Sequence, residues 1–370
     1  MLLVSEPILG DEEKAALSDV VECGWITMGE RVRAFEQAFA RHHGTSDAVA
    51  VNSCTAALHL ALEGLGVGPG DEVLVPSLTF VATANSVLYA GATPVFIDIE
   101  SLEIPLMSIA DADAKCTTKT KAIIIMHYAG YLADRHTWRD FARSRGLVLI
   151  EDAAHAAGVY GAGTFGDAAA FSFYGNKNMT TAEGGVVLAA DDAVLARIRQ
   201  MRGHGMTSGT RERLSSRSPT YDVTMLGYNY RLDELRAAIG LVQLKNLEWW
   251  NSRRQELTRR YHRRLSEDCP NVLVPFQVPR DAAYHIMPVI LPSSADRAQI
   301  MGKLRDAEIQ TTIHYPPVHS LSFYRDRCSS PRLSQTEEFA RRELTLPLHP
   351  KMEAWHVDRV AAELARALAG

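Results

Sequence analysis

The side chains best suited to chemistry lie in the middle of the chain, just after two apolar segments. Asp152 follows Leu147–Ile150, a run that is typical of a buried strand. Lys177 follows a second apolar segment, Ala168–Phe173, which contains Ser172. Open sheets of parallel strands bind their ligands outside the carboxyl ends of those strands. We therefore expect an acid, an amine and a hydroxyl to meet at one edge of a sheet.

This set of side chains fits pyridoxal phosphate (PLP). The Lys177 amine can form a Schiff base with the aldehyde of that cofactor. The Asp152 carboxylate can pair with the ring nitrogen and keep it protonated, so that the ring withdraws electrons. The spacing alone leaves an alternative open, in which Asp152 caps a helix and Lys177 is a solvated loop cation, because both residue types are ordinary in loops.

A second candidate site follows the short strand expected at Ala48–Val51. The next helix is predicted over Ala56–Leu65, and the free amides at a helix N-terminus favour an anion. A phosphate held by Thr55 and Ala56 is one interpretation, and an ordinary Ser/Thr N-cap is the other. Phe80 follows the next predicted strand, where it could stack on a flat heterocycle or simply fill the core.

These residues need a sheet to position them, and the patterning predicts one. Strands and helices alternate through roughly the first 190 residues, which is typical of a doubly wound parallel sheet. The expected strands are Ala48–Val51, Glu72–Val75, Thr93–Asp98, Ala122–Met126, Leu147–Ile150, Ala168–Phe173 and Val186–Ala189. The expected helices in this part include Gly10–Val21, Glu30–His42, Ala56–Leu65, Val81–Ala90 and Thr137–Arg145.

A long amphipathic helix, Leu232–Leu247, is expected to continue through two tryptophans into Arg253–Ser266 and to pass between two domains. The remainder of the chain is predicted to form a smaller α+β unit. Its expected elements are strands near Ala283–Leu291 and Gln310–His314 and helices at Ala295–Ala307 and Glu353–Leu368.

Composition limits the class of protein. The chain has 370 residues, enough for a large and a smaller domain, and its 46% apolar and 22% charged residues are ordinary for a globular enzyme. A net charge of −5 gives no general affinity for nucleic acid. The five cysteines are scattered without metal-ligand spacing, so we expect free thiols, a reducing compartment and no metal site.

The ends of the chain and its apolar runs also bear on location. The first residues, MLLVSEPILGDEEKAAL, lack a basic region and soon become acidic, so no signal peptide is expected. No apolar run approaches the roughly 20 residues that a membrane span needs. We therefore expect a cytoplasmic protein with no membrane partner.

The sequence resembles the fold type I, PLP-dependent nucleotide-sugar aminotransferases of the DegT/StrS type. The likeness covers nearly the whole chain, and it is specific because many matching segments occur in the same order. They are Gly24–Gly29, Asn52–Leu58, Gly70–Val73, Pro76–Thr83, Gly91–Asp98, Glu151–Ala154, Phe171–Gly185, Gly227–Gly240 and His314–His319. The resemblance implies an α/β fold with a large PLP-binding domain, residues 1–247, built on a mostly parallel sheet, and a smaller C-terminal α+β domain, residues 248–370.

The resemblance also implies a role for each matching residue. Lys177 would form the Schiff base and carry the proton, and Asp152 would pair with the pyridinium nitrogen. Ser172, with the amides of Thr55 and Ala56, would bind the cofactor phosphate. Phe80 would then stack on the cofactor ring.

Other residues are implied to act at the rim of the site. Asn229 would reach the phosphate of a neighbouring subunit, which implies a homodimer with shared active sites. Arg231, His314 and His319 are expected to bind substrate, and for Arg231 an alternative stays open, in which it only braces its loop. Two positions depart from the family pattern. Cys54 stands where Gly is usual and needs room beside the phosphate. His155 stands where Gln is frequent, facing the phenolic oxygen of the cofactor, and can still donate a hydrogen bond there.

The implied reaction moves an amino group from glutamate to a keto-sugar nucleotide. The segments Phe173–Lys177 and Thr180–Gly185 resemble the 4-amino branch, so a 4-keto-6-deoxyhexose ranks first, a 3-keto sugar second and a cyclitol ketone third. Related sugar 3-dehydratases replace the lysine by His, so Lys177 favours transamination. A non-enzymatic regulatory protein with the same fold is the other class considered, and the nucleotide cannot be read from the sequence.

Overall fold

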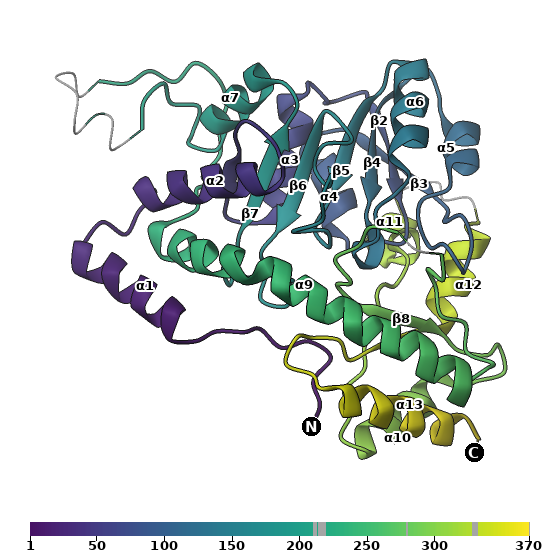
Figure 1. The fold of residues 1–370 in the computed structure, drawn as a ribbon. Helices are drawn as coiled ribbons and strands as arrows, with labels where there is room; N and C mark the ends of the chain where they lie inside the picture. Colours follow the sequence, from purple (N-terminus) through teal and green to yellow (C-terminus); the bar gives the residue numbers. More distant parts are fainter. Residues whose placement is uncertain (210–212, 214–219, 279, 328–331, 370) are drawn as a thin grey trace.

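The computed structural model describes residues 1–209, 213, 220–278, 280–327 and 332–369 (Figure 1). Its centre is a sheet of seven strands in the order β1-β7-β6-β5-β4-β2-β3. These strands are β1 (Val49–Val51), β2 (Glu72–Pro76), β3 (Thr93–Ile97), β4 (Thr120–Met126), β5 (Val148–Asp152), β6 (Ala168–Ser172) and β7 (Gly185–Ala189). Within the described ranges, no helix has both the length and the apolar character needed to cross a membrane.

Most of this sheet is parallel. The strands β6, β5, β4, β2 and β3 run in the same direction, whereas β7 is antiparallel to β6 and β1 is antiparallel to β7. Parallel strands covered on both faces are expected to be apolar throughout. Ala168–Ser172 is buried at every position, as this arrangement requires. The predicted α/β fold with a mostly parallel central sheet is therefore confirmed.

Helices cover both faces of the sheet and create two cores. On one face, Phe35 and Phe39 of α2, Phe141 of α6 and Leu244 of α9 (Glu234–Asp268) pack on the strands. On the other face, the helices α3, α4 and α7 pack on the alternate strand residues. Val87 of α4, for example, is buried in this second core. The helices of this part are α1 (Asp11–Cys23), α2 (Glu30–His42), α3 (Cys54–Gly64), α4 (Ala82–Tyr89), α5 (Ile109–Lys115), α6 (Arg135–Arg145) and α7 (Asp192–Met201). A 3₁₀ turn, η1 (Tyr128–Gly130), follows β4.

The helix α9 (Glu234–Asp268) crosses the molecule and joins the two parts of the chain (Figure 1). Beyond Trp250 it enters a third core, where Leu257 and Leu265 pack with the two-stranded sheet of β8 and β9. The remaining elements are β8 (Met287–Ile290), α10 (Arg297–Asp306), η2 (Val318–Ser320), α11 (Ser322–Arg325), α12 (Ser334–Arg342), β9 (Glu343–Leu346) and α13 (Ala354–Ala369). The N-terminal residue Leu2 also pairs with this part, through Ile309.

Two expectations for the C-terminal part need comment. The prediction of a strand near Gln310–His314 is wrong, because the structure has only isolated β-bridges in this region, at Ile309 and Thr312. The short edge contacts satisfy these backbone groups without a continuous ladder. The predicted passage between two domains lies inside one unbroken helix, α9. The boundary after residue 247 stays a prediction.

Candidate active site

Lys177 and Asp152 come together at the carboxyl edge of the sheet. Asp152 is the last residue of β5 and is paired in register with Ala170 of β6. Lys177 lies in the loop between β6 and β7, and its amide donates to the carbonyl of Tyr174 at 3.0 Å. The two charged groups interact electrostatically, and Cys54, the first residue of α3, interacts with both. The juxtaposition predicted from two strand ends is therefore present.

The Asp152 carboxylate is buried and held by two donors. Thr83 donates its hydroxyl to Oδ2 at 2.7 Å, and the amide of Ala154 donates to Oδ1 at 3.1 Å. Burial raises the pKa of Asp152 above its usual value, while these hydrogen bonds and the positive charge of Lys177 act in the opposite direction. A carboxylate that stays ionised in a buried position needs a cationic partner, because burial removes its solvation by water. Because the two donors bind different oxygens, they orient the carboxylate.

The Lys177 amine is tuned towards neutrality. Burial lowers its pKa from 10.5 to about 8, although Cys54 and Asp152 oppose the shift. An amine with a pKa near neutral pH can act as a nucleophile and can accept and return a proton. The local environment thus gives Lys177 the two properties that Schiff-base chemistry demands.

The N-terminus of α3 faces the same edge. Ser53 caps the helix by accepting the amide of Ala56 at 3.1 Å, which is the ordinary N-cap that the sequence left open. The backbone of Gly185 approaches so closely that a side chain there would lie 2.7 Å from the Cys54 amide nitrogen. Since Gly185 pairs with Ser172 in register, Ser172 and the start of α3 lie on either side of one narrow space. Thr55, the next residue of the helix, is half-buried.

A cluster of aromatic and histidine side chains closes the site from the C-terminal part. His155 is buried, and its Nε2 lies 2.9 Å from the hydroxyl of Tyr315. The ring of His285 lies 4.2 Å from that of His155, centroid to centroid. Asn178, which follows Lys177, holds His285 through a 2.8 Å contact to Nδ1. The sequence singled out His155 but missed Tyr315, His285 and Asn178, although Tyr315 lies inside the segment that carried the resemblance.

Three further expected residues lie around this cluster. Phe80 is 57% exposed, and its ring lies 6.1 Å from that of Tyr315. This exposure favours a ring that contacts a ligand over one that fills the core. His314 interacts electrostatically with Lys177, and burial lowers its pKa to about 3. Its Nδ1 lies 2.9 Å from the Thr345 hydroxyl, and its amide donates to Glu343.

The remaining predicted residues are placed differently. His319 is buried, with Nδ1 2.6 Å from the Ser77 hydroxyl and Nε2 3.4 Å from a Glu337 oxygen. Both of its ring nitrogens are therefore engaged, so in this conformation His319 braces a loop. Asn229 is exposed, and Arg231 is half-buried beside β1, where it pairs with Val51 through the backbone. The single chain thus leaves the Asn229 side chain at the surface.

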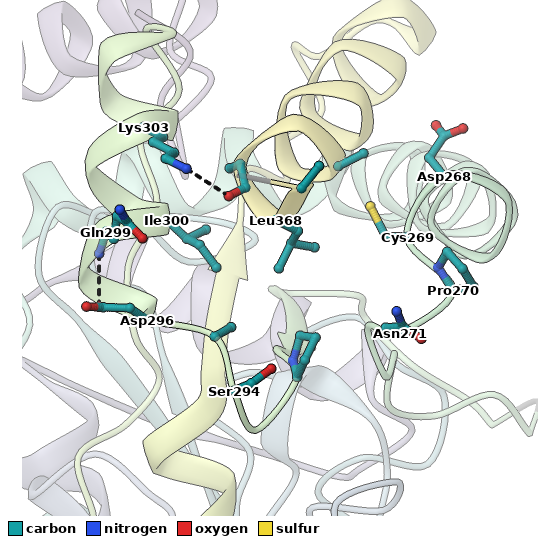
Figure 2. A pocket seen from close by; sticks show the side chains of 15 residues that line it. Asp268, Cys269, Pro270, Asn271, Ser294, Asp296, Gln299, Ile300, Lys303 and Leu368 are labelled. Atoms are coloured by element: carbon teal, nitrogen blue, oxygen red, sulfur yellow. Dashed lines mark hydrogen bonds between the residues drawn. The ribbon is translucent and has the colours of Figure 1, made fainter.

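One cavity of the described chain lies away from this site. It has a volume of about 480 Å3 and lies between α10, α13 and the end of α9 (Figure 2). Its polar groups bond locally, as Lys303 does to the carbonyl of Ala367 and the Gln299 amide to Asp296. A smaller cavity lies beside Lys177. Geometry and charge, rather than cavity size, identify the chemical site.

The residues present fit PLP. A carboxylate fixed by Thr83 and Ala154 can receive a protonated ring nitrogen, and the near-neutral Lys177 can receive the aldehyde. Nδ1 of His155 is buried and has no hydrogen-bond partner among the described residues. A buried polar atom of this kind needs a partner, and the phenolic oxygen of the cofactor would supply one.

A mostly parallel sheet with a buried lysine–aspartate pair at its carboxyl edge defines a fold type I transferase of the aminotransferase class. The model of the DegT/DnrJ/EryC1/StrS aminotransferase family matches residues 7–365. The chain belongs to that family. The predicted enzyme class, a PLP-dependent sugar aminotransferase, and the predicted cofactor are confirmed by this membership.

Solved structures agree with this assignment. The aminotransferase TlmJ from Streptoalloteichus hindustanus is 33% identical, with a TM-score of 0.91 over 100% of this chain and 99% of TlmJ. NtdA from Bacillus subtilis, solved with bound cofactor PMP (pyridoxamine phosphate), is 28% identical, with a TM-score of 0.89 over 97% of this chain and 82% of NtdA. DesI, solved in the presence of its TDP-sugar product, is 29% identical, with a TM-score of 0.88 over 99% of this chain and 93% of DesI.

Proposed function

We propose that the enzyme moves an amino group from L-glutamate to a keto-sugar nucleotide, with a 4-keto-6-deoxyhexose as the first candidate acceptor. The observation that carries the proposal is the buried Lys177–Asp152 pair in a chain of this family. The TDP-sugar product of DesI supports a nucleotide-sugar acceptor. The choice of C4 over C3 rests on the likeness of Phe173–Lys177 and Thr180–Gly185 to the 4-amino branch.

Two residues are proposed to perform the chemistry. When bound, the cofactor supplies an aldehyde that accepts the amino group and a ring that withdraws electrons. Lys177 would hold the aldehyde of the cofactor, and once the donor amine has replaced it there, the free Lys177 amine would take a proton from Cα of the donor as a base and give it back as an acid. Its pKa of about 8 suits both directions of transfer. Asp152 keeps the ring nitrogen protonated, and Thr83 holds Asp152 in place.

The remaining roles follow from position. Ser172 and the amides of Thr55 and Ala56 are proposed to bind the cofactor phosphate. Their support is the close approach of β7 to the start of α3 and the positive end of the helix dipole. Phe80 is proposed to cover the ring, and its exposure leaves it free to do so. His155 is proposed to donate to the phenolic oxygen. His314, Arg231 and His319 are retained as substrate-binding candidates, with His319 the weakest because both nitrogens are engaged.

We further propose a homodimer with shared active sites. In one chain the Asn229 side chain is exposed, while its backbone carbonyl accepts a hydrogen bond from the side-chain amide of Asn52 at 3.4 Å. Because the backbone of Asn229 is held and its side chain is exposed, this side chain suits a contact with the cofactor phosphate of a second copy of the chain. Twofold symmetry would make that contact reciprocal. The cytoplasmic location expected from the cysteine pattern stays a prediction.

A coupled assay tests the acceptor. Glutamate first converts the holoenzyme to its PMP form, and the excess glutamate is then removed. The candidate acceptors, which are 4-keto sugar nucleotides, 3-keto sugar nucleotides and a cyclitol ketone, are added in separate reactions. Mass spectrometry should detect an amino product first with a 4-keto-6-deoxyhexose nucleotide. A product formed only with the cyclitol or a 3-keto sugar would overturn the choice of acceptor but not the aminotransferase class.

A further inference from the structure

A buried arginine behind the Lys177 loop has no counter-ion among the residues that the structure describes. Arg254 of α9 is 3% exposed, and its Nε and Nη1 have no hydrogen-bond partner among the residues that the structure describes. Burial lowers the pKa of Arg254 to about 9, and no carboxylate of the described residues opposes this shift. An arginine with this pKa is still protonated at neutral pH. A buried, unpaired charge costs several kcal/mol, of the order set by ion desolvation, so the site requires a ligand.

Two more buried residues near Arg254 have unsatisfied polar atoms. Thr258, one helical turn further along α9, is 3% exposed, and its hydroxyl has no partner in the described chain. His349 is also 3% exposed, and neither of its ring nitrogens has a partner there. Arg254 interacts electrostatically with His349, which shows that the two are neighbours. Guanidinium, hydroxyl and imidazole groups can all donate hydrogen bonds, so this cluster matches an acceptor.

The nearby acids do not supply that acceptor. Glu6 interacts with His349, but its carboxylate pairs with Lys351 at 2.6 Å. The adjacent Arg253 faces the other way and pairs with Glu256 and Glu353 at 2.9 and 3.1 Å. The two neighbouring arginines thus differ: Arg253 has two acidic partners, whereas no ion pair of Arg254 occurs in the part of the chain that the structure describes.

A small cavity adjoins the cluster. Arg254 lines it together with Glu6, Lys177, Asn178 and Pro350, the residue after His349. Its volume of about 10 Å3 is enough for about one particle of the size of water. A dicarboxylate donor or a sugar nucleotide is far larger than this space. The size therefore excludes both substrates and leaves room for a species about as small as water, such as a small inorganic ion.

We propose that Arg254, Thr258 and His349 bind a small monovalent inorganic anion, of the class of chloride, at the junction behind Lys177. Such an anion neutralises the guanidinium and accepts the free hydrogen-bond donors. It also joins the N-terminal segment at Glu6–Ile8 to α9, because both line the same cavity. The site is independent of the sugar substrate, so its test stands apart from the test of the acceptor.

Diffraction with bromide tests the site directly. Crystals of the holoenzyme are grown without chloride and soaked in sodium bromide, and anomalous scattering is measured at the bromine edge. We expect a peak within hydrogen-bond distance of Arg254 and Thr258. Density that refines as water, without an anomalous peak at this position, would overturn the proposal.

Thermal unfolding tests the same site in solution. At constant ionic strength, replacing sodium gluconate by sodium chloride should raise the Tm of the holoenzyme saturably, by about 2 °C or more at concentrations well above Kd. Arg254→Met should abolish this chloride dependence and Thr258→Val should weaken it. The matched control, Arg253→Met, should retain it, because Arg253 lies outside the cluster.

The outcomes are distinguishable. If the Arg254 variant does not fold, Thr258→Val and the bromide measurement on the unaltered enzyme still decide the question. Equal melting temperatures in gluconate and chloride for the unaltered holoenzyme would refute the site. A chloride effect that persists in Arg254→Met would refute it as well.

Discussion

The hydroxyl of Tyr315 lies 2.9 Å from Nε2 of His155, while Nδ1 of the same ring has no partner among the described residues. Burial lowers the pKa of His155 well below its usual value and raises the pKa of Tyr315. Both groups are therefore neutral, and the imidazole carries one proton. A tyrosine that donates to Nε2 leaves this proton on Nδ1. Tyr315 is thus suited to orient His155 as a donor towards the cofactor.

The first prediction tests this arrangement. Tyr315→Phe removes the hydroxyl that contacts Nε2 of His155, so the imidazole proton can lie on either nitrogen. This change should shift the visible absorbance of the bound cofactor and slow the half-reaction with glutamate about tenfold. In the His155→Gln background the same Tyr315→Phe change should have little effect, because an amide donates without a tautomer choice. Absorbance spectra and stopped-flow rates provide the measurement. Equal losses in both backgrounds would show that Tyr315 acts elsewhere.

The second prediction concerns the amine. Lys177→Ala should reduce transamination by several orders of magnitude, since it removes covalent catalysis and the proton carrier together. The matched control is Lys351→Ala, which removes a surface lysine paired with Glu6. Single-turnover rates with glutamate are measured for both variants. A near-normal rate for Lys177→Ala would disprove its role.

The third prediction concerns the carboxylate. Asp152→Asn should still bind PLP but should slow the glutamate half-reaction by about a hundredfold or more, because an amide does not stabilise a protonated ring nitrogen. Thr83→Val should cause a smaller loss, since it removes only the hydroxyl that holds Oδ2. Stopped-flow absorbance reports both. The assignment fails if Asp152→Asn reacts as fast as the unaltered enzyme.

The fourth prediction tests shared sites by subunit mixing. Lys177→Ala chains and Asn229→Asp chains are each expected to be inactive, the latter because its carboxylate would repel a phosphate. In a hybrid dimer with shared sites, one site carries both lesions and the other carries none. Activity should then return to about half per hybrid, with each unmixed variant as the control. If Asn229 serves its own chain, mixing restores nothing, and a monomer by sedimentation would also exclude sharing.

The fifth prediction concerns pH and stability. Glu343 is fully buried, and burial raises its pKa from 4.5 to about 8, so the folded state binds this proton more tightly than the unfolded state does. Its stabilising contribution is present below pH 4.5 and is lost as the pH rises through about 8. The free energy of unfolding should therefore fall between pH 5 and 8.

Glu343→Gln should flatten this pH dependence, because an amide does not titrate and can still accept the His314 amide. A residual slope of the same sign should persist, since the pKa of Asp152 is also raised. Urea unfolding at several pH values measures the slopes. The matched control is Glu338→Gln, an acid at the surface paired with Arg341. An unchanged slope in Glu343→Gln would contradict the prediction.

The local part of the fold could be predicted from sequence, because it is encoded by short-range patterns. The helix expected at Glu30–His42 has the predicted ends, and the strand expected at Leu147–Ile150 lies within one or two residues of β5. Strand order could not be predicted in the same way. The antiparallel placement of β1 beside β7 depends on pairing between residues that are over 130 positions apart, such as Val49 and Val187.

The C-terminal part was harder to predict for a related reason. Its strand β9 begins with Glu343, whose charge hides the strand pattern, and the carboxylate is accommodated only because the His314 amide and Thr345 hydroxyl bond to it. α12 and α5 were not predicted either. In the site, the positions of Lys177 and Asp152 could be predicted because both residues follow apolar runs that form strands. The contacts of Tyr315 and His285 with His155 could not be predicted in this way, because they form only when the C-terminal part of the chain folds against the sheet.

The unbroken helix α9 has a mechanical consequence. At 1.5 Å per residue its 35 residues form a rod of about 52 Å. Near its middle, Asn251 accepts a hydrogen bond from Asn178 at 2.7 Å, directly beside Lys177, while its far end is embedded in the C-terminal core. A stiff rod turns as a unit, so a tilt of the C-terminal part acts as a lever on the loop that carries the reactive amine.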